Sequence, residues 1–158
     1  MVMGHYQLTY PAARGFSETT EPTGPCGGFN TAGNRSQFPL QNGFLEVNSE
    51  HTSYSYQVYF SAGENPTAFN TSIQIGSGQV NYPAQSCWAI NFPANAGISN
   101  GTVGTIQAIY NAGDGMLYQC ADVVVVSSPA NFNTSACVNA DGSKPNLGSS
   151  NSSSSSSS

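Results

Sequence analysis

The feature that most constrains the fold is the short segment with alternating side chains, typical of a β-strand, which recurs along most of the chain. In the segment YSYQVYF (residues 54–60), Tyr54, Tyr56, Val58 and Phe60 alternate with intervening side chains that are mostly polar. A period of two places one face of a strand in a core and the other toward solvent. Similar short runs are separated by clusters of Gly, Pro and Asn, and long amphipathic helical patterns are absent. The sequence therefore predicts an all-β protein.

Seven such runs indicate an antiparallel β-sandwich of the immunoglobulin or fibronectin type. We expect strands at residues 6–10, 43–47, 53–61, 69–76, 87–93, 104–110 and 116–126. Strand signals stop near residue 127, and the chain ends in a run of serines that cannot form a core. We therefore expect a folded domain over residues 5–138, followed by a disordered Ser-rich linker at 139–158.

The surface is predicted to be polar but almost uncharged. Charged residues make up 7% of the chain, with three basic side chains against eight acidic ones. Because Lys and Arg clusters neutralise phosphates, a chain with so few of them offers no surface for nucleic acid or for an anionic membrane. We exclude nucleic acid as a partner.

Four cysteines, Cys26, Cys87, Cys120 and Cys137, form an even set without C-x-x-C spacing. This arrangement favours two disulfides over a zinc site or a redox motif, and it indicates an oxidising compartment. Four cysteines allow three pairings, and spacing does not choose among them. We favour Cys26 with Cys137 and Cys87 with Cys120.

Several features favour export from the cell. Asn-X-Ser/Thr sequons, each able to carry a glycan, stand at Asn34, Asn70, Asn100, Asn133 and Asn151. The serine tail is typical of a glycosylated spacer, which often precedes a membrane-anchor signal. We expect a secreted protein held at the plasma membrane or cell wall by a glycosylphosphatidylinositol anchor encoded beyond residue 158.

The first four residues, MVMG, fit the end of a signal peptide. Small residues before the cut are what signal peptidase requires, and Gly4 with Val2 meets this requirement if cleavage occurs before His5. His5 would then become the first residue of the mature protein. The alternative is that MVMG is an added or true start.

Common hydrolytic sites are not indicated. The cysteines are expected to be paired, and neither histidine stands in a nucleophile-elbow context. A paired-carboxylate hydrolase needs two acids in a defined relation, and no spacing singles out a pair. The acids considered are Glu46, Glu50, Glu64, Asp114, Asp122 and Asp141. We assign no catalytic residue.

A metal site formed by His5, His51 and Asp122 is the remaining chemistry. A free amine on His5 has a pKa of roughly 8 and would chelate one ion together with its own imidazole. His51 would add a third nitrogen, a donor set that suits Cu(II). Asp122 lies on a mostly apolar strand face and needs a positive partner, either the metal or Arg14. His51 could equally be a half-exposed loop residue.

A family resemblance supports the metal interpretation. The segments HYQLTYPAARGF, TEPTGPCGGFN, NRSQFPL, SCWAINFP, NGTVGTIQAIY and LYQCADVVVV resemble fungal copper-binding proteins that are similar in fold to lytic polysaccharide monooxygenases, the Bim-type copper acquisition factors. The resemblance runs from His5 to about Cys137. It implies an immunoglobulin-like sandwich, two disulfides and one copper ion held by an N-terminal histidine, a second histidine and an aspartate. Here these roles fall on His5, His51 and Asp122.

The resemblance implies copper acquisition or homeostasis at the fungal cell surface, not polysaccharide oxidation. The partners would be the copper ion and either a membrane copper importer or a cell-wall component, and we expect a monomer. One alternative is an oxidative copper enzyme on cell-wall glycans, with Tyr6, Tyr54 or Trp88 as a sugar-stacking surface. Another is a structural wall glycoprotein without metal. With residues 1–4 in place, His5 has no free amine, so the copper expectation applies to the processed form.

Overall fold

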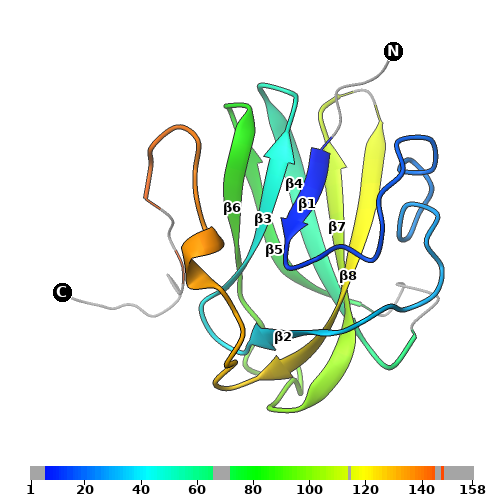
Figure 1. Ribbon diagram of the computed structural model, residues 1–158, viewed down its shortest axis with the longest axis vertical. Helices are drawn as coiled ribbons and strands as arrows, with labels where there is room; N and C mark the ends of the chain where they lie inside the picture. Colours follow the sequence, from blue (N-terminus) through cyan, green and yellow to red (C-terminus); the bar gives the residue numbers. More distant parts are fainter. Residues whose placement is uncertain (1–5, 66–71, 114, 145–146, 148–158) are drawn as a thin grey trace.

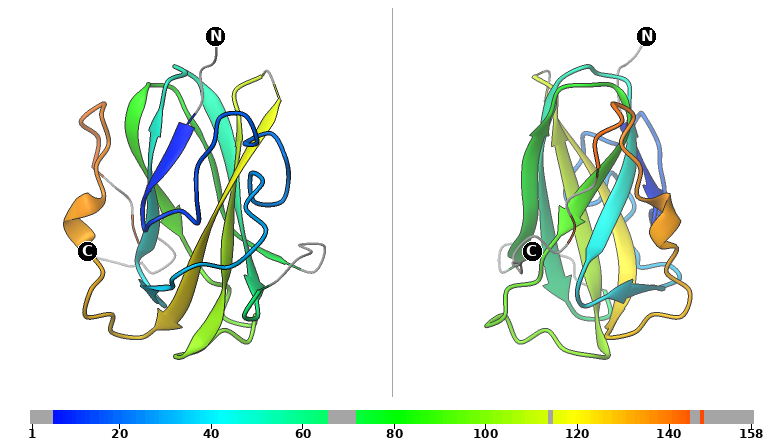
Figure 2. Two further views of the ribbon diagram at one scale, coloured as in Figure 1. Left: turned by 45° about the vertical axis from the view of Figure 1, so that its right-hand side comes forward. Right: turned by 90° about the vertical axis from the view of Figure 1, so that its left-hand side faces the viewer.

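Two β-sheets packed face to face form the molecule. The computed structural model describes residues 6–65, 72–113, 115–144 and 147. The smaller sheet has the order β1-β3-β6, with β1 (Tyr6–Tyr10), β3 (Gly43–Ser49) and β6 (Ala84–Ile90). The larger sheet has the order β2-β8-β7-β4-β5, with β2 (Ser36–Pro39), β8 (Met116–Val126), β7 (Thr102–Asn111), β4 (Tyr54–Ala62) and β5 (Ile73–Val80). The predicted all-β sandwich is confirmed (Figures 1 and 2).

Each of the seven predicted strands overlaps an observed one, and the differences have local causes. Strand β2 was not predicted, because four residues ending in Pro39 carry little periodic signal. It pairs in parallel with β8 at the edge of the larger sheet, while the other strand pairs are antiparallel. Strand β5 begins later than expected, and residues 69–71 of that predicted strand lie outside the described residues.

Aromatic side chains dominate the core between the sheets. The Tyr6 ring stacks on Tyr110, with centroids 4.5 Å apart and planes at 8°, and Tyr54 contacts Tyr110 at 4.5 Å. Tyr6 lies 6.0 Å from Trp88. Tyr6, Tyr54 and Trp88 are 1%, 3% and 0% exposed, so the predicted sugar-stacking surface does not exist at these residues. They are core residues, as aromatic side chains in strands usually are.

The disulfides pair differently from our prediction. Cys26 is bonded to Cys120, and Cys87 is bonded to Cys137. The cause is the alternation of side chains: Ala121 and Trp88 face the core, so the cysteines next to them face outward from different sheets. Each outward cysteine meets the loop that covers its own sheet. The preference for pairing Cys87 with Cys120 was therefore wrong.

The folded domain extends past the predicted boundary at residue 138. A C-terminal strap, residues 129–144, runs along the outside of the smaller sheet and contains a 3-10 turn, Thr134–Ala136 (Figure 1). Within it, Ala140 N donates to Gln85 O of β6 at 2.8 Å, and Cys87 N donates to the Asn139 side chain at 2.8 Å. Residues 139–144 thus belong to the domain. No helix in the described ranges is long and apolar enough to cross a bilayer.

An N-terminal loop, residues 11–35, covers the outer face of β7 and β8, and a buried ion pair fastens it (Figure 1). Arg14 Nη2 lies 2.7 Å from Asp122 Oδ1, and Arg14 Nε donates to Asp122 Oδ2 at 3.1 Å. Gly33 N and Thr105 Oγ1 donate to the same carboxylate at 2.7 and 2.8 Å. Each carboxylate oxygen therefore accepts two hydrogen bonds. Of the two positive partners considered for Asp122, a metal ion or Arg14, the structure shows Arg14.

Opposing influences act on the Asp122 carboxyl. Burial raises its pKa, but hydrogen bonds from Arg14, Gly33 and Thr105, with the charge of Arg14, outweigh burial and hold the pKa below its usual value. A carboxylate with a lowered folded-state pKa stabilises the fold above its unfolded pKa, and this contribution is lost as the pH falls through the folded pKa. The ion pair between Arg14 and Asp122, which clamps the N-terminal loop onto β8, is therefore fully formed at neutral pH.

We predict that Asp122→Asn lowers the free energy of unfolding at pH 7 by about 3 kcal/mol, because it leaves Arg14 buried without its counter-charge. Denaturant titrations between pH 2 and 7 would measure this, and the difference from wild type should shrink below about pH 4. Asp141→Asn, at an exposed carboxylate, is the control and should change the free energy of unfolding far less. An equal loss of unfolding free energy in Asp122→Asn and Asp141→Asn would contradict the stabilising role of this ion pair.

Candidate metal centre

His51 lies in the connection between β3 and β4, at the end of the sandwich where β1 begins (Figure 1). Its backbone is fixed by Ser49, whose Oγ accepts from His51 N at 3.1 Å and donates to His51 O at 3.2 Å. The same Ser49 Oγ is 2.6 Å from Tyr110 Oη, and the His51 ring lies 6.2 Å from the Tyr110 ring. His51 is half-buried and anchored to the core by its neighbours.

The start of β1 is held at the same end by a buried amide. Gln119 Nε2 donates to Tyr6 O at 2.8 Å, and Gln119 Oε1 accepts from Leu8 N at 3.0 Å. The side chain of Gln119, on β8 of the larger sheet, thus bonds β1 as a neighbouring strand would. On its other side, Tyr6 pairs with Ser49 of β3. The first described residue is therefore fixed from both sheets.

Glu21 of the N-terminal loop completes this arrangement. Its Oε2 accepts from Gln119 Nε2 at 2.8 Å, and its backbone O accepts from Tyr118 N at 2.9 Å. Glu21 is 1% exposed, and Oε1 is buried without a hydrogen-bond partner among the described residues. Burial raises the pKa of this carboxyl to about 7, although the bond from Gln119 acts in the opposite direction. Near neutral pH, Glu21 can therefore supply a negative charge close to Tyr6.

More acidic groups surround the start of β1. A shallow pocket of about 200 Å³ is lined by Tyr6, Gln7, Phe16, Glu18, Asn48 and Glu50. Glu18 and Glu50 are exposed, and neither Lys nor Arg lines this pocket. The local field therefore favours the approach of a cation.

The three residues predicted as ligands are not seen together. His5 lies outside the described residues. Asp122 is five residues from Leu117 along β8, roughly 17 Å at 3.4 Å per residue, and Leu117 is the strand partner of Tyr110 beside His51. Among the described residues, no group of three His, Cys, Asp or Glu side chains could hold a metal ion. We therefore do not retain Asp122 as a ligand; the ion pair with Arg14 uses both of its oxygens.

The chemistry at the His51 end suits a copper ion. The imidazole of His51 is a nitrogen donor that a divalent copper ion accepts, and the acidic side chains around the start of β1 favour a cation. The buried, unpartnered Oε1 of Glu21 is consistent with a positive charge nearby, because a buried carboxylate without a partner is costly.

Glu46, another buried acid with a pKa raised by burial to about 7, lies under the C-terminal strap, where Val138 N donates to it. Glu46 therefore holds the C-terminal strap against β3.

Sequence reasoning missed Gln119 and Glu21. Gln119 directly precedes Cys120 in a strand whose core-facing positions are otherwise apolar, and such a break in the alternation was a usable signal. Glu21 lies in the loop TTEPTGPC, where no periodicity marks an acid as buried. Its burial depends on the contact between that loop and β8.

Comparisons with known proteins agree on a family. A profile described as Copper acquisition factor BIM1-like matches residues 3–142. The chain is 35% identical over 147 residues to "Copper acquisition factor BIM1" of Cryptococcus neoformans var. grubii, covering 87% of this chain and 67% of the relative. The corresponding protein of var. neoformans is 34% identical, covering 78% and 61%. "Lytic polysaccharide monooxygenase-like protein X325" of Yarrowia lipolytica is 33% identical, covering 87% and 55%.

The solved structures support the fold. One chain, described as a polysaccharide monooxygenase CBM33, matches with a TM-score of 0.50 at 15% identity, covering 76% of this chain and 78% of that one. At this identity the match shows a shared sandwich fold and no more. The chain spans between 55% and 67% of the length of the three relatives above. Its profile match and its identity to these relatives show that the chain belongs to the BIM1-like copper acquisition factor family.

Proposed function

We propose that this protein binds Cu(II) outside the cell and delivers it for uptake, with the copper at the end of the sandwich where β1 begins. The observation that carries the proposal is the strand register: Tyr6, which directly follows His5, pairs with Ser49, which stands two residues before His51. The copper-related role itself comes from the family.

The proposed ligands are the amine and imidazole of His5 and the imidazole of His51. Three nitrogens of this kind form the T-shaped donor set that suits Cu(II). In this proposal, Gln119 and Glu21 position the start of β1, and Glu21 adds negative charge without binding the metal. Exposed Glu18 and Glu50 raise the local concentration of cations.

A carrier at the cell surface fits the remaining features. Two disulfides favour an oxidising compartment, and the sequon residues Asn34, Asn100 and Asn133 are exposed. Asn70 and Asn151 lie outside the described residues. We propose that the protein is exported, with its tail leading to a glycosylphosphatidylinositol anchor, and that it passes copper to a membrane importer or a wall component.

A carrier role is favoured over polysaccharide oxidation because Tyr6 and Tyr54, which were candidates for a sugar-stacking surface, are buried in the core. The names of the relatives also favour a carrier, since the two with the highest identity among those described above are called copper acquisition factors.

The first prediction concerns the nitrogen ligands. Protein that begins at His5 should bind one Cu(II) in isothermal titration. His51→Ala should weaken this binding by at least about 100-fold, because loss of a ligand should cost no less than loss of a group that supports one. Retaining residues 1–4 should cause a similar loss, because the amine becomes an amide. Thr52→Ala, next to His51, is the control and should bind normally. Equal affinity in all four proteins would exclude this site.

The second prediction concerns Glu21. Glu21→Gln keeps an acceptor for Gln119 but removes the charge, so we expect copper affinity at pH 8 to fall about tenfold. Because the pKa of Glu21 is raised to about 7, the difference from wild type should fade as the pH falls through that value. Copper titrations at pH 6, 7 and 8 would measure this.

Glu64→Gln is the matched control, since Glu64 is exposed and does not line the pocket at the start of β1, and this change should alter affinity less than twofold. Asp114→Asn is a useful addition, because Asp114 lies in sequence between β7 and β8, although outside the described residues. A large loss in Asp114→Asn, with none in Glu21→Gln, would contradict the role given to Glu21.

The third prediction separates carrier from enzyme. Copper-loaded protein incubated with ascorbate, hydrogen peroxide and chitin or β-glucan should release no oxidised oligosaccharides by mass spectrometry. A copper-loaded polysaccharide monooxygenase is the positive control. Oxidised products that disappear in His51→Ala would replace the carrier proposal with an enzymatic one.

A further inference from the structure

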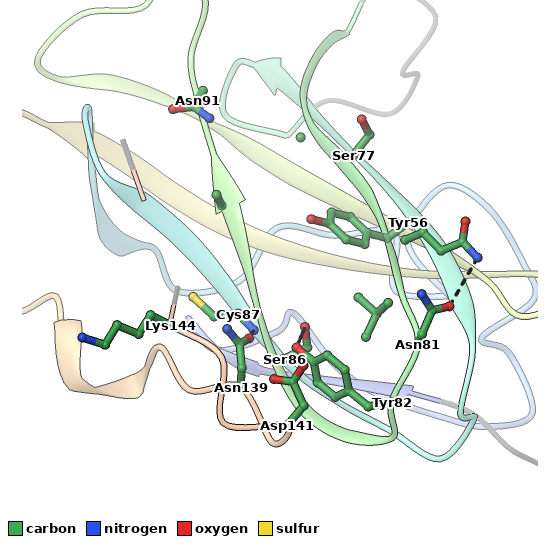
Figure 3. Close-up of a pocket in the computed structure, with 14 residues that line it drawn as sticks. Tyr56, Ser77, Asn81, Tyr82, Ser86, Cys87, Asn91, Asn139, Asp141 and Lys144 are labelled. Carbon is green, nitrogen blue, oxygen red and sulfur yellow. Dashed lines mark hydrogen bonds between the residues drawn. The ribbon is translucent and has the colours of Figure 1, made fainter. Parts of the chain in front are cut away.

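A groove of about 740 Å³ opens between β5 and β6, and the copper proposal makes no use of it (Figure 3). Its volume falls in the range of roughly 300–1,000 Å³ that is typical of ligand pockets. Fourteen residues line it, coming from β4, β5, β6, the β5–β6 turn and the C-terminal strap. The groove is therefore built from segments that lie far apart in the sequence.

The way the strands meet keeps the groove open. β5 and β6 are edge strands of different sheets. They are joined by residues 81–83 at one end, and at the other end Asn91 N donates to Ile75 O at 2.9 Å. Between these two junctions the strands separate. The strap closes one side and is fixed to β6 by the disulfide between Cys87 and Cys137 and by the bond from Cys87 N to Asn139.

A tyrosine ring packed against the core forms the floor of the groove. The Tyr56 ring stacks on the buried Trp88 ring, with centroids 4.0 Å apart and planes at 3°. A Cβ atom on Gly78 would lie 2.8 Å from Tyr56 Oη, and one on Gly76 would lie 3.0 Å from Ala89 O. The wall of β5 is therefore bare where Tyr56 comes close, and the ring is held in place before any ligand arrives.

The lining is polar and almost neutral. Only Gly76, Val80, Cys87 and Ala89 among the fourteen residues lack a hydrogen-bonding side chain. Four side-chain amides come from Gln79, Asn81, Asn91 and Asn139, and Figure 3 shows Tyr56 and Tyr82 between the strands. The charged groups are one carboxylate, Asp141, and one ammonium, Lys144. The Asn139 amide already has partners within the protein on both its oxygen and its nitrogen. Gln79 Nε2 donates to Asn81 Oδ1, so Gln79 Oε1, Asn81 Nδ2 and the exposed Asn91 amide are the groups that offer acceptors and donors to a ligand.

We propose that this groove binds a neutral oligosaccharide. Sugars present many hydroxyl groups, which amides bond in either direction, and they present C–H faces that pack on tyrosine rings. An apolar small molecule would displace water from the Asn91 amide and the other exposed polar groups of the lining without replacing its hydrogen bonds, at a cost for each. An anionic ligand would meet one positive and one negative charge. The composition of the lining thus selects a hydroxyl-rich, uncharged ligand.

A peptide adding as a β-strand fits less well. Such binding requires an open backbone edge. Here Gln85 O, Cys87 N and Ile75 O already have partners in the strap or on the opposite strand. These bonds shorten the backbone edge with which a peptide could pair.

The test is binding of three neutral hexasaccharides, built from β-1,4-linked N-acetylglucosamine, β-1,3-linked glucose and α-linked mannose, to the full chain in the presence of EDTA. We expect millimolar or tighter binding of at least one, measured by shifts of side-chain amide signals in NMR spectra. Tyr82→Ala and Asn91→Ala should each weaken it by about tenfold. Tyr59→Ala, a half-buried tyrosine of β4 outside the groove, should leave it unchanged.

Asn91 is exposed, so its substitution should not affect folding, and Tyr82→Ala is checked by its NMR spectrum without sugar. Absence of binding by all three sugars would overturn the proposal. Binding that both Tyr82→Ala and Asn91→Ala leave intact would also overturn it. A peptide of residues 145–158, the segment that follows the strap in the sequence, is added as a competitor, and displacement of the sugar by this peptide would overturn the proposal as well. Because EDTA removes copper, the result is independent of the copper site.

Discussion

The side chain of Gln119 is the interaction on which the N-terminal end of the molecule depends. It satisfies the backbone of β1 at Tyr6 and Leu8 from the opposite sheet, and it binds Glu21 with its remaining proton. Both donors and the acceptor of the amide are therefore in use. Without this bridge, β1 would be tied to the fold chiefly through its pairing with β3 and through the Tyr6 ring.

The two loops outside the sandwich have separate roles. The N-terminal loop is clamped by Arg14 and Asp122 and by the disulfide from Cys26 to Cys120, and these contacts deliver Glu21 to Gln119. The C-terminal strap is fixed by the disulfide from Cys87 to Cys137 and forms one wall of the groove between β5 and β6. In the part of the chain that the structure describes, a buried ion pair and two disulfides thus fix the segments that lie outside the strands.

Local rules predicted the strands well, because alternation is a property of neighbouring residues. Tyr54, Val58 and Phe60 are buried as their spacing indicated, and the need of Asp122 for a partner was also visible in its strand. The choice between Arg14 and a metal as that partner depended on a loop more than 100 residues away in sequence. The pairing of Cys26 and the burial of Glu21 depended on the same loop, and the pairing of Cys87 depended on the C-terminal strap, so spacing could not provide them.

The central claim is that copper is held by the N-terminal residue and His51. Electron paramagnetic resonance of Cu(II) in protein that begins at His5, with nitrogen couplings counted by pulsed methods in samples carrying ¹⁵N-labelled histidine, tests this most directly. The account predicts three coordinating nitrogens, with His51→Ala losing one of the two imidazoles. A spectrum with one or two nitrogens, unchanged by His51→Ala or by retaining residues 1–4, would contradict it.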